Sequence, residues 1–322
     1  MKRAPSNVSK FIKSKRKKIS FYFVTCMLIL SLAVITYIMY QCGILESFCG
    51  KIINVTGLQD YREASIDYPL SVHFIDVGCG DSILIKADDK NLLIDTGCYS
   101  LNGDTSEYLK NVGVTHIDLF IASHTDSDHI GDFSSVANHF PINKIWLSDF
   151  CQKRETEWSE DEKIFYQTIS KLHIKVDSPE TGIYDFGSFT IEVLSPTEKS
   201  KNDNDNSLVL RLDYGDASFL FTGDTGKKIE KQLLREHKNI KTDILKAGHH
   251  GSNTSSTQEF LKEAAPSYTV ISAGTENKFL PNRFCIDRIN DCGSKILRTD
   301  LNGSIIFVYD GKELSYLTEY EH

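Results

Sequence analysis

The sequence predicts an α/β domain that follows a basic N-terminal tail and an apolar membrane segment. Three observations support this prediction: an uncharged stretch near the N-terminus, short apolar strands alternating with helices from residue 69 onward, and a dense group of His and Asp residues after one of those strands. We therefore divide the chain into a tail (1–20), a membrane span (21–40), a spacer (41–68) and one globular domain (69–322).

The N-terminal segment has the composition of a signal-anchor. Residues 1–20 carry eight Lys or Arg and no acidic residue, and residues 21–40 carry no charge. About 20 apolar residues cross a bilayer, and a basic flank stays in the cytoplasm. The rival interpretation is a cleavable signal peptide, whose apolar region is shorter, roughly 7–15 residues. We expect a single-pass protein of the cell membrane, with a cytoplasmic N-terminus and an extracytoplasmic domain.

The alternation of strands and helices in the domain predicts the α/β class. Apolar runs with strand character occur at 70–76, 82–86, 91–95, 117–122, 190–194, 208–212, 218–221, 243–246, 269–272, 295–297, 304–309 and 313–317. Helical patterns occur at 105–112, 129–137, 157–172, 226–237 and 256–264. An Asp310–Gly311 turn joins the last two strands as a hairpin.

Charge and cysteine content limit the partners and the compartment. From residue 21 onward, 28 Lys plus Arg stand against 44 Asp plus Glu, which repels nucleic acid unless a local patch or a bound metal reverses the field. Seven cysteines lie outside the membrane span, and some can pair. The candidate pairs are Cys42 with Cys49, Cys285 with Cys292, and Cys79 with Cys98, which can meet in space. Burial as small apolar side chains is an equal alternative.

Potential metal ligands concentrate after the apolar run 117–123. His124, Asp126, Asp128 and His129 fall within six residues, at a predicted strand end and helix start. Imidazole and carboxylate groups suit divalent cations. Other predicted strands also end in polar groups, and strand ends that converge on one edge commonly form sites. These groups contain Asp76, Asp81, Asp95, Asp224, His249, His250 and Ser252.

Several of these segments together resemble one family. VHFIDVGCGDSILI, NLLIDTG, SHTDSDHIGD, NSLVLRLDYGDASFLFTGD, ILKAGHHGSNTSS and VISAG occur in family order over roughly residues 70–310. The chain thus resembles the metallo-β-lactamase superfamily, and within it the soluble hydrolase domain of ComEC-type DNA-uptake competence proteins. The resemblance implies a four-layer αββα sandwich with a metal site between the sheet edges. Because the chain lacks the many spans of a full ComEC channel, we expect a singly anchored version of that domain.

The resemblance also assigns roles to residues. His124 and Asp126 would bind one divalent ion, Asp128 and His129 the other, and Asp224 would bridge them. A strand-like backbone would point His249 and His250 to opposite sides, so only one is expected to be a ligand. We favour His250 as the ligand and His249 as a phosphate contact or proton donor, and the reverse assignment stays open. We expect Asp128, Asp224 and His249 to be the catalytic residues. We expect Asp76, Asp81, Asp95 and Ser252 to support the ligands or the substrate.

Two departures from the family pattern affect the interpretation. The position of a further metal-binding His, in a Gly-His-Thr turn, falls here in 203–207, so Asp205, Asn206 or water takes its place. An oxygen-rich site favours Mn²⁺ as well as Zn²⁺. A His-Pro pair that ComEC-like domains often carry is replaced by Leu280-Pro281, which weakens the expectation of nuclease activity.

We expect two-metal hydrolysis of a phosphodiester, with DNA as one candidate substrate. The acidic body favours cell-envelope polymers or small phosphoesters at least as well. A β-lactamase is disfavoured by the missing His, and an inactive binding protein by the full set of predicted ligands.

Overall fold

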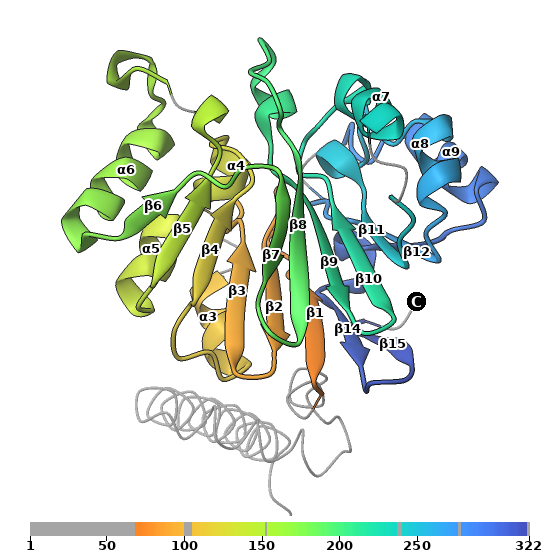
Figure 1. Cartoon of the computed structure of the whole chain (residues 1–322), viewed down its shortest axis with the longest axis horizontal. Helices are drawn as coiled ribbons and strands as arrows, with labels where there is room; N and C mark the ends of the chain where they lie inside the picture. The colour runs from red at the N-terminus through yellow and green to blue at the C-terminus, as the bar shows by residue number, and fades with distance from the viewer. Residues whose placement is uncertain (1–67, 100–104, 152, 237–239, 276–277, 321–322) are drawn as a thin grey trace, which may run out of the picture. The chain divides into compact units, whose positions relative to one another are not determined.

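The computed structural model describes residues 68–320 except 100–104, 152, 237–239 and 276–277. The predicted tail, membrane span and spacer lie outside these residues and stay predictions. Within the described part of the chain, no helix combines the length and apolar character needed to cross a membrane. The described residues belong to one compact unit, and its layers can be followed in Figure 1.

Two mixed β-sheets form the centre of the domain. The first has the order β15-β14-β1-β2-β3-β4-β5-β6, antiparallel up to β3 and parallel from β3 to β6. Its strands are β1 (Leu70–Phe74), β2 (Ile83–Ala87), β3 (Lys90–Ile94), β4 (Leu119–Ala122), β5 (Lys144–Leu147), β6 (Lys175–Asp177), β14 (Ile305–Tyr309) and β15 (Leu314–Thr318).

The second sheet has the order β13-β12-β11-β10-β9-β8-β7. It is parallel from β13 to β10 and antiparallel from β10 to β7. Its strands are β7 (Gly182–Asp185), β8 (Phe189–Ser195), β9 (Val209–Tyr214), β10 (Ala217–Phe221), β11 (Ile244–Lys246), β12 (Tyr268–Ile271) and β13 (Lys295–Arg298).

Side-chain alternation along the strands builds three cores. Phe74 of β1 and Phe221 of β10 meet between the sheets, with ring centroids 6.2 Å apart. The opposite face of the first sheet packs on one set of helices, and that of the second sheet on another. The first set contains α3 (Thr105–Asn111), α4 (Ser127–Ile130), α5 (Phe133–His139) and α6 (Glu160–Leu172). The second contains α7 (Lys227–Glu236), α8 (Gln258–Ala264) and α9 (Arg283–Asp291). A short helix α10 (Thr299–Asn302) follows β13. The predicted α/β fold with two sheets covered by helices is confirmed.

Several predicted elements were wrong or incomplete. The helix predicted over 129–137 is two helices, α4 and α5, which are separated at Gly131. A Cβ atom at Gly131 would lie 2.5 Å from the backbone of Ser127 and of Tyr99, so the chain packs too tightly there for a larger residue. The helix predicted from residue 157 begins at Glu160, because Ser159 caps it by accepting a hydrogen bond from the Glu162 amide.

Five strands or α-helices had no predicted counterpart: the strands β5, β6 and β7 and the helices α9 and α10. The three strands are only three or four residues long, and β6 and β7 are largely exposed, so they lack a clear apolar signal. Helix α9 alternates charged and apolar residues and starts where the Asn282 side chain accepts a hydrogen bond from the Phe284 amide.

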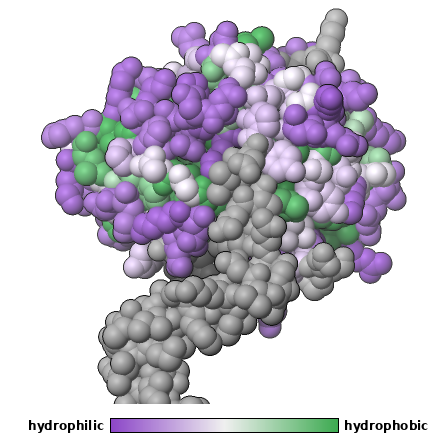
Figure 2. All heavy atoms as spheres, turned by 90° about the horizontal axis from the view of Figure 1, so that it is seen from below, coloured by the Kyte–Doolittle hydropathy of each residue, from purple (hydrophilic) through white to green (hydrophobic). Residues whose placement is uncertain are grey.

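The described cysteines form no disulfide. Cys285 lies inside α9 and Cys292 caps the same helix, so this predicted pair does not close a loop. The side chains of Cys79 and Cys98 do meet, through a hydrogen bond. Viewed from below, the visible surface is mostly hydrophilic with scattered apolar residues (Figure 2).

Candidate metal centre

Four side chains from both halves of the domain converge at one point. Asp128 and His129 come from α4, which follows β4, whereas Asp224 follows β10 and His250 follows β11. One potential ligand atom from each of these residues lies within 4.8 Å of all the others. The Nε2 atom of His250 is 3.3 Å from a carboxylate oxygen of Asp128 and 3.4 Å from one of Asp224. The Nε2 atom of His129 is 3.4 Å from the other oxygen of Asp224.

The residues present fit a divalent cation. The Nε2 atoms of His124, His129 and His250 and one oxygen of Asp224 are buried and have no hydrogen-bond partner among the described residues. Buried polar atoms are normally paired, and those left unpaired call for an explanation such as an ion. Imidazole nitrogens and carboxylate oxygens together are a donor set for Zn²⁺ or Mn²⁺.

His124 and Asp126 lie beside the four-residue cluster. The ring centroid of His124 is 4.1 Å from that of His129, and its Nε2 atom is 3.6 Å from the Asp126 carboxylate. Asp126 is the more open of the two, with 40% of its side chain exposed. The structure thus places all six predicted ligands in one region, with His124 buried and Asp126 partly open to solvent.

Carboxylates control the charge of the buried imidazoles. Burial lowers the pKa of His250, but the charges of Asp224 and Asp81 outweigh that effect and raise it to about 10. Asp224 and Asp95 raise the pKa of His129 in the same way, against the effect of burial. For Asp224, burial raises the pKa, yet the two imidazoles hold it well below its usual range. The cluster without metal is therefore a compact group of opposite charges.

Asp95, which the sequence predicts as a supporting residue, contacts the Nδ1 atom of His129. Its Oδ2 atom is 2.8 Å from Nδ1 of His129 and also accepts a hydrogen bond from the Ser123 hydroxyl at 2.6 Å. The Ser123 amide donates to the other carboxylate oxygen at 2.7 Å. This arrangement leaves Nε2 of His129 as the atom facing the cluster.

Asp81 contacts His250 and is paired with Lys246, a residue that no motif in the sequence singled out. Lys246 is fully buried, and its Nζ atom is 2.8 Å from Asp81. The second oxygen of Asp81 is 3.6 Å from Nδ1 of His250, which lies 3.2 Å from the carbonyl oxygen of Ser272. A charged residue inside the short apolar strand β11 was the available signal, because Lys is almost never fully buried unless it is paired.

The His249–His250 pair lies on a 3₁₀ turn and not on a strand, so the geometric argument for opposite directions was wrong. The turn η5 (Gly248–Gly251) holds both histidines in the left-handed region, with φ of 48° and 52°. Such residues cost about 1–3 kcal/mol each and cluster at functional sites. His250 is buried in the cluster, whereas His249 is 34% exposed, with Nε2 3.8 Å from Asp224.

The other predicted supporting residues form hydrogen bonds with loop residues around them. Asp76 accepts a hydrogen bond from the Gly78 amide and caps a turn. Asp205 and Asn206 form part of the 3₁₀ helix η4 (Asp203–Asn206); Asp205 accepts from the Gly226 amide, and Asn206 bonds to the backbone of Ser200. These contacts hold the loop around η4 in place. Ser252 hydrogen-bonds to Thr254 within its own turn.

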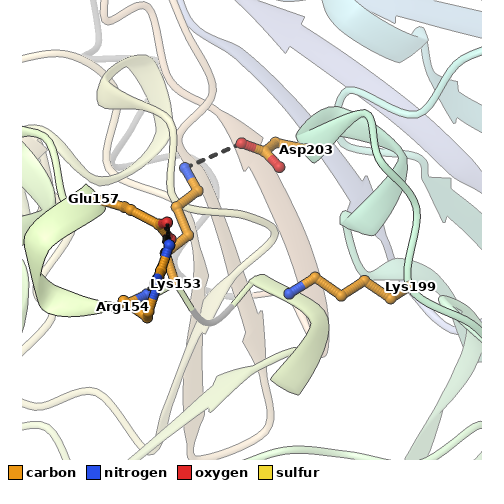
Figure 3. A pocket seen from close by; sticks show the side chains of 5 residues that line it. All are labelled: Lys153, Arg154, Glu157, Lys199 and Asp203. Atoms are coloured by element: carbon orange, nitrogen blue, oxygen red, sulfur yellow. Dashed lines mark hydrogen bonds and ion pairs between the residues drawn. The ribbon is translucent and has the colours of Figure 1, made fainter.

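A charged pocket with a volume of about 590 Å³ lies between the segment that precedes α6 and the loop that contains η4. Lys153, Arg154, Glu157, Lys199 and Asp203 line it (Figure 3). Lys153 forms ion pairs with Asp203 at 3.1 Å and with Glu162 at 3.2 Å. Glu162 also accepts a hydrogen bond from Thr125, the residue between His124 and Asp126. The pocket is thus connected to the metal-ligand segment through a single carboxylate.

The match to a family model agrees with this site. The model of the metallo-beta-lactamase superfamily matches residues 75–275, and the chain belongs to this family. ComE operon protein 3 of Bacillus subtilis is 29% identical over 75% of this chain and 33% of its own length. Competence protein ComA of Neisseria gonorrhoeae is 33% identical over 80% of this chain and 35% of its own length.

Both relatives are ComEC-type competence proteins, so the predicted resemblance is confirmed. The chain spans about a third of the length of each. Among solved structures, a mutant of the CmlA beta-hydroxylase matches with a TM-score of 0.51 and 11% identity, covering 74% of this chain and 54% of that one. This likeness supports the fold alone.

Proposed function

We propose that this chain is a membrane-anchored, extracytoplasmic phosphodiesterase that uses two divalent ions, Zn²⁺ or Mn²⁺. One observation carries the proposal: buried imidazole nitrogens and a buried carboxylate oxygen face one another without hydrogen-bond partners among the described residues. The relatives named for competence favour a phosphodiester, because DNA is the polymer that competence proteins handle.

In this proposal, His124, Asp126, Asp128, His129, Asp224 and His250 hold the ions. Bound divalent ions would polarise the phosphoryl oxygens and bring the pKa of water at the centre toward about 7. Asp95 and the carbonyl oxygen of Ser272 face the Nδ1 atoms of His129 and His250, so both rings present Nε2. Asp224 lies between these rings and neutralises their charge.

We assign the role of proton donor to His249. It is partly exposed, and its Nε2 atom is 3.8 Å from Asp224 at the edge of the cluster. A side chain there can reach a substrate that enters from solvent and protonate the leaving oxygen. The buried His250 has no such access.

The charged pocket supports a substrate with more than one phosphate. Lys153, Arg154 and Lys199 bring three cationic groups to one opening in an otherwise acidic domain, and a polyanion needs such a patch for binding. Glu157 and Asp203 line the same opening, so the net positive charge is small. This balance and the acidic body favour, as a second candidate, a small phosphodiester or an envelope polymer.

The test uses the purified full chain, stripped of metal and reloaded with Zn²⁺ or Mn²⁺. Its turnover is measured on bis(p-nitrophenyl) phosphate and on single-stranded DNA, beside the Asp224→Ala variant. DNA cleavage that is lost in the variant supports a nuclease, and turnover of the small diester alone supports the second candidate. Absence of metal uptake and of turnover would contradict both.

A further inference from the structure

The two cysteines nearest the metal centre lie on neighbouring loops and are in contact. Cys79 follows β1 in the Gly78–Gly80 loop, and Cys98 follows β3, and their side chains hydrogen-bond. We propose that Cys79 and Cys98 are a redox-active pair that forms a disulfide and thereby fixes the backbone beneath Asp128. This inference does not depend on which substrate the centre hydrolyses.

Backbone contacts hold the two loops together around the pair. The Gly97 amide, one residue before Cys98, donates to the carbonyl oxygen of Asp81 at 2.7 Å. The Asp81 amide in turn donates to the carbonyl oxygen of Asp128 at 3.2 Å. Both cysteines are partly exposed, so a soluble oxidant can reach them. The fold therefore holds Cys79 and Cys98 close to each other, and solvent can reach both side chains.

Glycines make this close approach possible. A Cβ atom at Gly80 would lie 2.0 Å from the carbonyl oxygen of Asp128. A Cβ atom at Gly131 would lie 2.9 Å from the backbone of Cys98. The Gly78–Gly80 loop thus packs against Asp128, and the backbone of Cys98 packs against Gly131, just after His129 and Ile130. A covalent bond between the loops would restrict the movement of that segment.

The oxidant is an external disulfide, either a small molecule or a protein. The hydrogen bond with Cys79 and burial raise the pKa of the Cys98 thiol, so it is the thiolate of Cys79 that attacks the external disulfide and releases one external thiol. The second cysteine then displaces the other external thiol from the mixed disulfide. One S–S bond forms within the chain, the external S–S bond breaks, and the two thiol protons end on the released thiols. Extracytoplasmic compartments supply oxidants of this class.

Peptide mapping tests whether the bond forms. The full chain is incubated with oxidised or reduced glutathione, alkylated and digested with trypsin. Cleavage after Lys or Arg places Cys79 alone in peptide 63–86 and Cys98 alone in peptide 91–110. We expect these two peptides to be joined after oxidation and separated by dithiothreitol. Full alkylation of both cysteines after oxidation, or joining of either to another cysteine, would overturn the proposal.

Thermal unfolding tests the structural consequence. A disulfide that closes a loop of this size is expected to raise the unfolding midpoint by about 5–10 °C in the oxidised form. The increase should vanish in the Cys79→Ser/Cys98→Ser double variant and persist in Cys292→Ser, whose cysteine caps α9. Release of bound Zn²⁺ to a chelator should also be slower in the oxidised wild type than in the reduced one. Equal midpoints and equal release rates in both states would show that the bond does not restrain the Asp128 segment.

Discussion

The two ligand segments of the metal centre are built in opposite ways. In the first half of the domain, four of the six candidate ligands lie within residues 124–129, on an ordinary strand-to-helix connection. In the second half, Asp224 and His250 come from separate strand ends, and His250 lies in a turn with two left-handed residues. The comparison indicates that local sequence positions the four ligands of the first segment. The positions of Asp224 and His250 depend instead on the packing of the whole second sheet.

The largest effect is expected at Asp224, where the two halves meet. The Asp224→Ala variant should lose about 10³-fold or more in turnover, because Asp224 lies between His129 and His250. Turnover is measured on bis(p-nitrophenyl) phosphate, with circular dichroism as the control for folding. Full activity in the variant, or loss of the fold, would contradict this role.

We expect the adjacent residues His249 and His250 to have different functions. His250→Ala should weaken metal binding by about 10–100-fold, because the buried imidazole points into the cluster. His249→Ala should retain its metal and lose turnover only. Metal content after dialysis against a chelator distinguishes the two variants. The reverse pattern would exchange the roles of the two residues.

The metal-free protein and metal binding should respond oppositely to pH. The pKa of His250 is raised to about 10 in the folded state by Asp224 and Asp81, so its stabilising ion pairs are intact below about pH 6.5 and are lost as pH rises through 10. The metal-free protein should therefore unfold at lower temperatures as pH rises from 7 to 10.

Over the same pH interval, metal affinity should increase by about tenfold per pH unit for each proton released. Isothermal titration in buffers of different ionisation enthalpy measures that release. A binding enthalpy that is independent of the buffer would argue against protonated imidazoles in the metal-free cluster.

The smallest effect is expected in the charged pocket, which is linked to the first segment through Glu162. Lys153→Gln should raise KM for single-stranded DNA by about fivefold, which corresponds to about 1 kcal/mol, and leave KM for the small diester unchanged. The matched control is Lys312→Gln in the hairpin between β14 and β15, where no change is expected. Equal effects on both substrates would mean that Lys153 acts through Glu162 on the ligand segment and does not bind DNA.

The sequence predicted most of the fold and the location of the centre. The apolar strands that build the core between the sheets, and the dense His-Asp segment, are local signals. A Lys within an apolar strand indicates that Lys246 is buried and paired, but its partner could not be predicted, because Asp81 is distant in the chain and only the fold brings them to 2.8 Å. The left-handed turn at His249 and His250 could not be predicted either, because a His-His pair does not indicate positive φ. Short exposed strands such as β6 lacked an apolar pattern.

The separation of the ligands along the chain has a consequence for how the protein acquires its ions. Asp128 and Asp224 are almost a hundred residues apart in sequence, so neither half of a growing or translocating polypeptide contains the complete centre. The ions can be bound with full affinity only after both sheets have docked. If the domain is exported before it folds, the metal that it binds depends on which divalent ions are available outside the cytoplasm.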